Sequence, residues 1–134
     1  MTLAPASLEA PPLGISVALI ALLFATSGVL HLVKPGPFVS IMPPWMPAAL
    51  LLVLASGVFE ILGAAGILVS YTRVAAGWGL IALLFAVFPA NVQMLINARS
   101  AHASALWMTG LIARLPLQVA LIIWVYRSTV RHAP

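Results

Sequence analysis

The chain has 134 residues, of which 63% are hydrophobic and only 6% are charged, with a formal net charge of +4. A soluble domain carries roughly 25% charged residues, so this chain could not cover its surface with polar groups, and its mean hydropathy of +1.17 suits lipid as the solvent. The absence of cysteine excludes disulfides, Cys-ligated zinc and iron–sulfur clusters, and the scattered basic residues form no cluster of the kind that binds nucleic acid.

The first predicted membrane helix follows a short tail. Residues 1–13 contain three prolines and no Lys or Arg, and we expect them to be a disordered N-terminal tail. The apolar run at residues 14–33 is long enough to cross about 30 Å of hydrocarbon. It exceeds the 7–15 residues of a signal-peptide core, so we interpret it as a retained membrane helix, with a cleaved signal peptide as the alternative.

A proline-rich loop comes next. The segment Lys34–Trp45, KPGPFVSIMPPW, contains four prolines and a glycine, so it cannot form a regular helix throughout. One interpretation is an interfacial loop with Trp45 in the aromatic belt. The other is a small lid over one end of the bundle, because Phe38, Ile41 and Met42 are apolar.

Three more apolar runs, at residues 46–70, 74–96 and 105–126, complete the predicted fold. Helices satisfy every backbone group within the segment, whereas membrane strands would alternate apolar and polar residues. We therefore predict an all-α bundle of four transmembrane helices over residues 14–126, with a proline-rich loop between the first two helices. Residues 127–134 are expected to be a C-terminal tail.

Four spans place both termini on one side of the membrane, here called the terminal side; the opposite side is called the loop side. The terminal side carries Arg73, Arg127 and Arg131, and the loop side carries Lys34 and Arg99. Because cytoplasmic loops are enriched in Lys and Arg, the count favours cytoplasmic termini.

Two ionisable residues interrupt the apolar runs. Glu60 lies in the second span and Arg114 in the fourth, and counting from the predicted span starts places both near the middle of the bilayer. A lone charge at that depth costs at least about 2.5–3.5 kcal/mol. We therefore predict an ion pair between them, in which the planar fork of Arg114 binds the carboxylate.

Further polar residues lie between mid-membrane and the loop side, which predicts a polar pocket that opens toward the proline-rich loop. On a helix, Ser27 and His31 share a face, as do Arg114 and Gln118. The candidate ligand-binding residues are Ser27, His31, Glu60, Asn91, Arg114 and Gln118. The alternative is that these residues only hold the bundle in register, as polar contacts between membrane helices often do.

Neither a catalytic set nor a metal site is evident. His31 and His102 both fall on the loop side, but no third ligand cluster or H-x-x-x-H pattern accompanies them, so haem and metal ions are disfavoured. No nucleophile–base–orienter set is present. We assign no catalytic residue and expect that the chain is not an enzyme on its own.

Four segments resemble the DoxX-like family of small four-helix membrane proteins, in a bacterial subgroup without assigned function: SGVLHLVKPGPFVSIMPPWMP (27–47), SGVFEILGAAGIL (56–68), FPANVQM (88–94) and RLPLQVALIIWVY (114–126). The resemblance implies a bacterial inner-membrane location and an association with redox complexes, since the family takes its name from a subunit of a thiosulfate–quinone oxidoreductase. It implies no catalytic residue. Glu60 is the one position that we carry over, as a family-typical polar residue.

Two functional hypotheses follow from the residues and the resemblance. In the first, the chain is a redox-associated membrane subunit that binds a small amphipathic, quinone-like ligand, with a redox protein or a second copy of itself as partner. In the second, it is a non-enzymatic scaffold or assembly factor, and the Glu60–Arg114 pair only fixes helix packing. A transporter is a third interpretation, which would require dimers.

Overall fold

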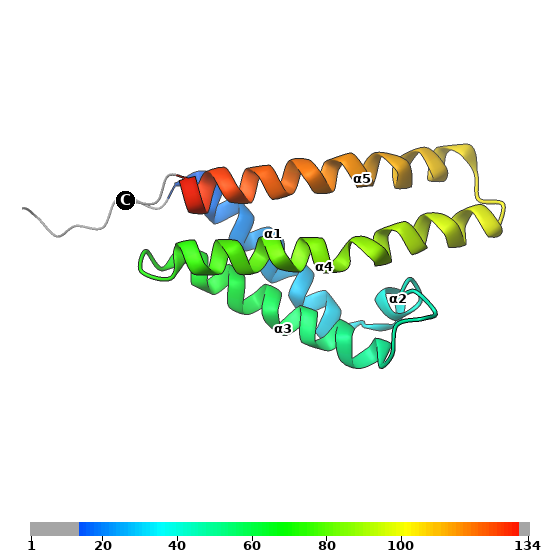
Figure 1. Cartoon of the computed structure of the whole chain (residues 1–134), viewed down its shortest axis with the longest axis horizontal. Helices are drawn as coiled ribbons and strands as arrows, with labels where there is room; N and C mark the ends of the chain where they lie inside the picture. Colours follow the sequence, from blue (N-terminus) through cyan, green and yellow to red (C-terminus); the bar gives the residue numbers. More distant parts are fainter. Residues whose placement is uncertain (1–13, 132–134) are drawn as a thin grey trace, which may run out of the picture.

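The computed structural model describes residues 14–131, so the tail expected at residues 1–13 lies outside the described residues, as do residues 132–134. Over the described range the chain is all-helical (Figure 1). The elements in chain order are α1 (Ile15–Val33), α2 (Gly36–Val39), α3 (Ala49–Leu68), α4 (Arg73–Ser100), α5 (Ala105–Val125) and the π-helix η1 (Tyr126–Arg131). This confirms the predicted all-α class.

Four helical segments are long and apolar enough to cross a membrane: α1, α3, α4, and α5 together with η1. Most of their large apolar side chains point outward; Leu22, Phe59 and Leu106, for example, are each at least 60% exposed. Such surfaces are stable in lipid and not in water. The protein is therefore an integral membrane protein, and the bilayer covers the outside of its helices.

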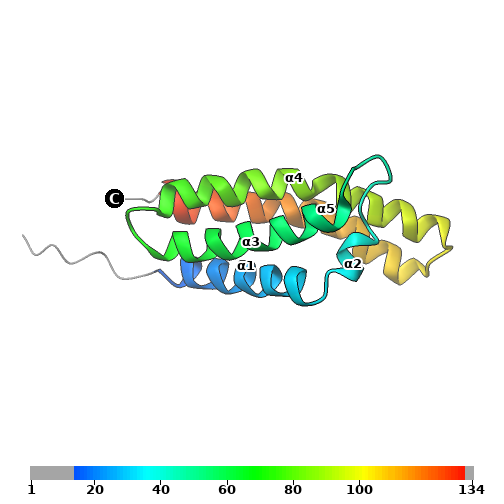
Figure 2. The ribbon, with the colours of Figure 1, turned by 90° about the horizontal axis from the view of Figure 1, so that it is seen from below.

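The helices pack in the order α1, α3, α4, α5, with each one against the next (Figures 1 and 2). The start of α1 and the end of η1 lie at the same end of the bundle, as four spans require. Contact between α1 and the fourth span is concentrated in η1, at the terminal side. Toward the loop side, α1 and α5 are not held together.

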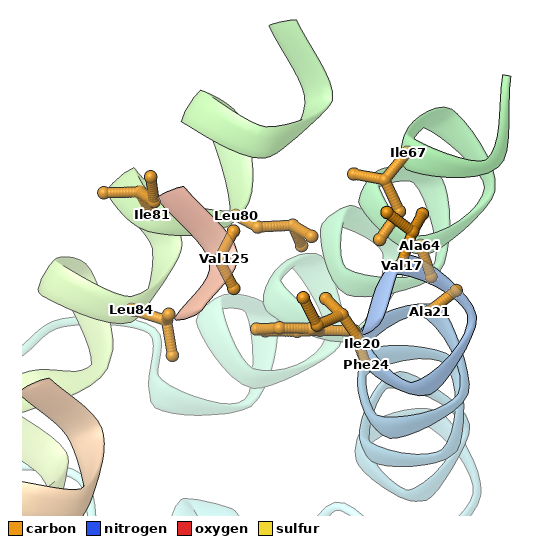
Figure 3. Close-up of a cluster of buried hydrophobic side chains, with 10 residues drawn as sticks. All are labelled: Val17, Ile20, Ala21, Phe24, Ala64, Ile67, Leu80, Ile81, Leu84 and Val125. Atoms are coloured by element: carbon orange, nitrogen blue, oxygen red, sulfur yellow. The ribbon is translucent and has the colours of Figure 1, made fainter. Parts of the chain in front are cut away.

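The hydrophobic core occupies the terminal half of the bundle, where all four spans meet (Figure 3). Ile20, Ile67, Leu80 and Val125, one from each span, are at most 1% exposed. The helices converge here and separate toward the loop side (Figure 1).

The helices α1 and α3 cross at two glycines. A Cβ atom built on Gly28 would lie 2.6 Å from the carbonyl oxygen of Gly57, and one built on Gly57 would lie 2.8 Å from the carbonyl oxygen of Gly28. Only glycine permits this backbone approach, which is typical of small residues at membrane helix interfaces. The crossing places Ser27 and His31 of α1 beside Glu60 of α3.

The helical segment extends through Arg131, so residues 127–131 are not the tail that the sequence predicted. Thr129 is fully buried and packs at Gly77 of α4, where an added Cβ would lie 2.8 Å from the Thr129 Cβ. Its hydroxyl donates to the carbonyl oxygen of Val125 (2.7 Å), so a polar residue is accommodated inside the bundle. The sequence prediction ended the span before Thr129 because hydropathy counts a threonine as polar even when its hydroxyl is bonded within its own helix.

The hairpin of α4 and α5 extends beyond the loop-side ends of α1 and α3 (Figures 1 and 2). α4 runs to Ser100, four residues past the predicted end of the third span. A polar cap begins α5, because the backbone N–H of Trp107 donates to the Ser104 hydroxyl (3.3 Å). Because of this extra length, a residue near the start of α5 lies closer to the loop side than its distance from the helix start suggests.

Candidate ligand site in the membrane

Glu60 is the centre of a polar cluster between α1 and α3. The Ser27 hydroxyl donates to Glu60 Oε1 (3.1 Å), and His31 Nδ1 lies 2.9 Å from Glu60 Oε2. The His31 and Glu60 side chains are only 12% and 10% exposed. Both side chains therefore depend largely on protein groups, and not on water, for their hydrogen bonds.

The hydrogen on His31 Nδ1 has two acceptors within reach. The carbonyl oxygen of Ser27 lies 2.8 Å away and can only accept, so Nδ1 must carry the hydrogen. That hydrogen points to the carbonyl, and Glu60 Oε2 therefore receives no hydrogen bond although it is buried and close to Nδ1. A carboxylate with room for about four hydrogen bonds thus receives one, from Ser27.

The predicted ion pair between Glu60 and Arg114 is wrong. Among the described residues, the partner within ion-pair distance of Glu60 is His31, and Arg114 is exposed. Gly63 faces Leu80 across α3 and α4, and α4 in turn meets η1 at Gly77. Counting along the antiparallel helices from these contacts puts Arg114 about 14 Å nearer the loop side than Glu60.

The prediction failed because it counted depth from the start of α5. The first turns of that helix lie beyond the ends of α1 and α3, so Arg114 is level with the loop-side ends of those helices rather than with the middle of the bilayer. At that level the guanidinium can reach the polar interface, which removes most of the cost of an unpaired charge.

A second polar group links α4 to α5. Gln118 is buried, and its amide nitrogen donates to the carbonyl oxygen of Leu84. Asn91 Nδ2 donates to Gln118 Oε1 (2.5 Å). Each amide nitrogen keeps one further N–H, so this wall offers hydrogen-bond donors, in contrast to the acceptor at Glu60.

All six candidate residues from the sequence line one cavity of about 450 Å³ in the loop-side half of the bundle. Its walls are mainly apolar, with side chains such as Phe24, Val53 and Leu121. Leu23 of α1 and Leu117 of α5 also line it and are 46% and 65% exposed. The cavity is therefore open to the lipid on the side where α1 and α5 are not held together.

The proline-rich loop folds against this cavity. Its Phe38, in the single helical turn α2, stacks on His31 with ring centroids 3.9 Å apart. Ile41, Met42 and Met46 line the cavity as well. Asn97 Nδ2 donates to the carbonyl oxygen of Ser40 (3.2 Å) and ties the loop to α4. This is the arrangement that the lid interpretation describes, while Trp45 is 71% exposed, as the interfacial interpretation expects.

The two loop-side histidines are not brought together. His102 lies in the exposed turn between α4 and α5, at a φ of 52°, and does not line the cavity. Over residues 14–131, the structure contains no group of three or more His, Cys, Asp or Glu side chains that could hold a metal ion.

Sequence reasoning missed the partner of Glu60. The i,i+4 spacing of Ser27 and His31 was available, but the depth of His31 relative to Glu60 depends on the Gly28–Gly57 crossing. Phe38 and Ser56 also line the cavity and were not among the predicted site residues. The sequence did contain a signal for Phe38, because it is a large apolar residue in the loop that directly follows the first span.

Comparison with known proteins places most of the chain in a sequence family. Residues 20–129 match a family described as "Domain of unknown function (DUF8561)", a range that includes the cavity and the helices around it. No curated protein and no solved structure shows significant similarity to the chain.

Proposed function

Since the chain belongs to the DUF8561 family, whose description states no activity, we propose a function from the cavity itself: this is a membrane protein that binds a small amphipathic, quinone-like ligand between its helices. The observation that carries the proposal is a lipid-accessible, mainly apolar cavity of about 450 Å³ that contains a buried carboxylate, Glu60, with unused hydrogen-bonding capacity.

The cavity suits such a ligand in size and in chemistry. Its volume falls within the roughly 300–1,000 Å³ that small-molecule sites occupy, and such sites combine apolar walls with a few polar groups. Glu60 lines the cavity on one side and the amides of Asn91 and Gln118 line it on another, so both oxygens of a quinone-like ring would have a polar partner. An apolar tail would leave past Leu23 and Leu117 into the lipid.

The proposal extends to a redox-associated, DoxX-like role in the bacterial inner membrane, with both termini cytoplasmic. The segment resemblance to DoxX-like proteins supports that role, and the excess of arginine on the terminal side supports that topology. The chain lacks cysteine, so electrons would come from a partner protein or from the quinone itself.

A scaffold or assembly role is the second candidate, and the Gly28–Gly57 crossing favours it. In that role the cluster of Ser27, His31 and Glu60 would fix how α1 lies on α3. The scaffold role no longer involves Arg114, because that residue does not pair with Glu60.

Ligand titration of the full chain in lipid nanodiscs tests the proposal. Decylubiquinone in its oxidised and reduced forms is titrated while tryptophan fluorescence is recorded. Ala90→Trp fills the cavity and should abolish binding, because Ala90 lines it. Ala75→Trp is the matched control, because Ala75 is exposed on the same helix, α4, and does not line the cavity. If neither form binds, or if both variants bind equally well, the proposed function is wrong.

A further inference from the structure

The hydrogen-bonding capacity of the cavity distinguishes between the two redox forms of a quinone-like ligand. A quinone oxygen can only accept hydrogen bonds, whereas each quinol hydroxyl can both donate and accept. Which form binds more tightly therefore depends on whether the buried groups of the site are donors or acceptors.

On the wall formed by α1 and α3, the carboxylate of Glu60 contributes unused hydrogen-bond acceptor capacity. Glu60 Oε1 accepts from the Ser27 hydroxyl, and Oε2 accepts from no group. The nearest donor, His31 Nδ1–H, is directed to the Ser27 carbonyl.

The wall formed by α4 and α5 contributes hydrogen-bond donors. Asn91 and Gln118 are joined by one hydrogen bond, and each retains an amide N–H. Arg114 adds guanidinium N–H groups at the loop-side end of the same cavity. A ligand oxygen that faces this wall can accept a hydrogen bond whether the ligand is a quinone or a quinol.

We propose that the cavity selects the reduced form of its ligand: the Glu60 carboxylate accepts a hydrogen bond from a quinol hydroxyl, and it repels the carbonyl oxygen of the corresponding quinone. The inference rests on the proposed function and specifies its substrate class as a membrane-dissolved hydroquinone. A buried acceptor left facing another acceptor costs affinity, which is why one hydroxyl can decide between otherwise similar ligands.

The test compares both redox forms on the full chain in nanodiscs. Decylubiquinol, kept reduced without oxygen, should bind about tenfold or more tightly than decylubiquinone, since hydrogen bonds to charged groups are among the strongest. A tenfold preference equals a rise of about 30 mV in the midpoint potential of the bound two-electron couple. Equal affinities, or tighter binding of the quinone, would overturn the inference while leaving the proposed function standing.

Two variants connect the preference to Glu60. Glu60→Gln places a donor as well as an acceptor on α3 and should bring the two affinities close together. Phe59→Leu is the control: Phe59 is next to Glu60 on α3, is 61% exposed and does not line the cavity, so the preference should persist. A preference that survives Glu60→Gln would overturn the inference.

If Glu60→Gln does not fold, the midpoint potential of the ligand bound to the unaltered chain tests the inference: a rise supports it, and no rise overturns it. Failure of both redox forms to bind would overturn the inference and the proposed function together.

Discussion

His31 Nδ1 of α1 lies 2.9 Å from Glu60 Oε2 of α3, so the ionisable neighbour of the buried acid comes from the first span and not from the fourth. The two side chains come from helices that cross at glycines, so their separation is set by backbone contact and not by flexible side chains. The same pair serves two roles, because it joins two helices and also forms one wall of the cavity.

Replacing His31 by leucine should destabilise the protein by about 3 kcal/mol, because removal of one partner of a buried ionisable pair is strongly destabilising. Unfolding in SDS, followed by tryptophan fluorescence, measures the change. The double variant His31→Leu/Glu60→Leu should recover most of the loss, since apolar side chains can replace a buried pair with little cost. If the double variant is no more stable than the single one, Glu60 does not depend on His31.

Replacing Arg114 by leucine should change the free energy of unfolding by less than about 1 kcal/mol. The side chain is exposed and makes no ion pair with Glu60, and exposed charges contribute little. The same SDS titration compares Arg114→Leu with His31→Leu. A loss for Arg114→Leu as large as that for His31→Leu would restore the pairing that the sequence suggested.

The number and position of the membrane helices could be predicted because each span is a continuous apolar run. In lipid, an apolar run of that length must form a helix to satisfy its backbone hydrogen bonds. Partners across the bundle could not be predicted, because they depend on relative depth. The prediction for Arg114 assumed that all spans begin at one level, whereas α4 and α5 extend past α1 and α3.

All six candidate polar residues nevertheless line one cavity. Their distribution between mid-membrane and the loop side is a property of the sequence, and it does not depend on which residue pairs with which. The positions of Phe38 and Met42 were harder to predict, because a loop rich in proline has no periodicity from which to read the buried face.

Replacing Gly57 by alanine should destabilise the protein by about 1–3 kcal/mol, the usual cost of overpacking. The new Cβ would lie 2.7 Å from the His31 Cβ and 2.8 Å from the carbonyl oxygen of Gly28, so the two backbones must separate. Gly79→Ala is the control: a Cβ there has no neighbour within 4 Å, and the residue lies inside α4. That variant should be unchanged or more stable by up to about 1 kcal/mol, because alanine favours the helix. Equal effects from both variants would show that the crossing is not tightly packed.

Replacing Phe38 by alanine should expose His31 to reagents without unfolding the bundle. The two rings are stacked, and the His31 side chain is 12% exposed. Diethylpyrocarbonate modification, located by mass spectrometry, should become severalfold faster at His31. His102 provides an internal reference because it lies in the exposed turn after α4, and its rate should not change. Phe85→Ala is the matched variant, since Phe85 is 64% exposed and does not line the cavity. An unchanged rate at His31 in Phe38→Ala would mean that the proline-rich loop does not cover the cavity.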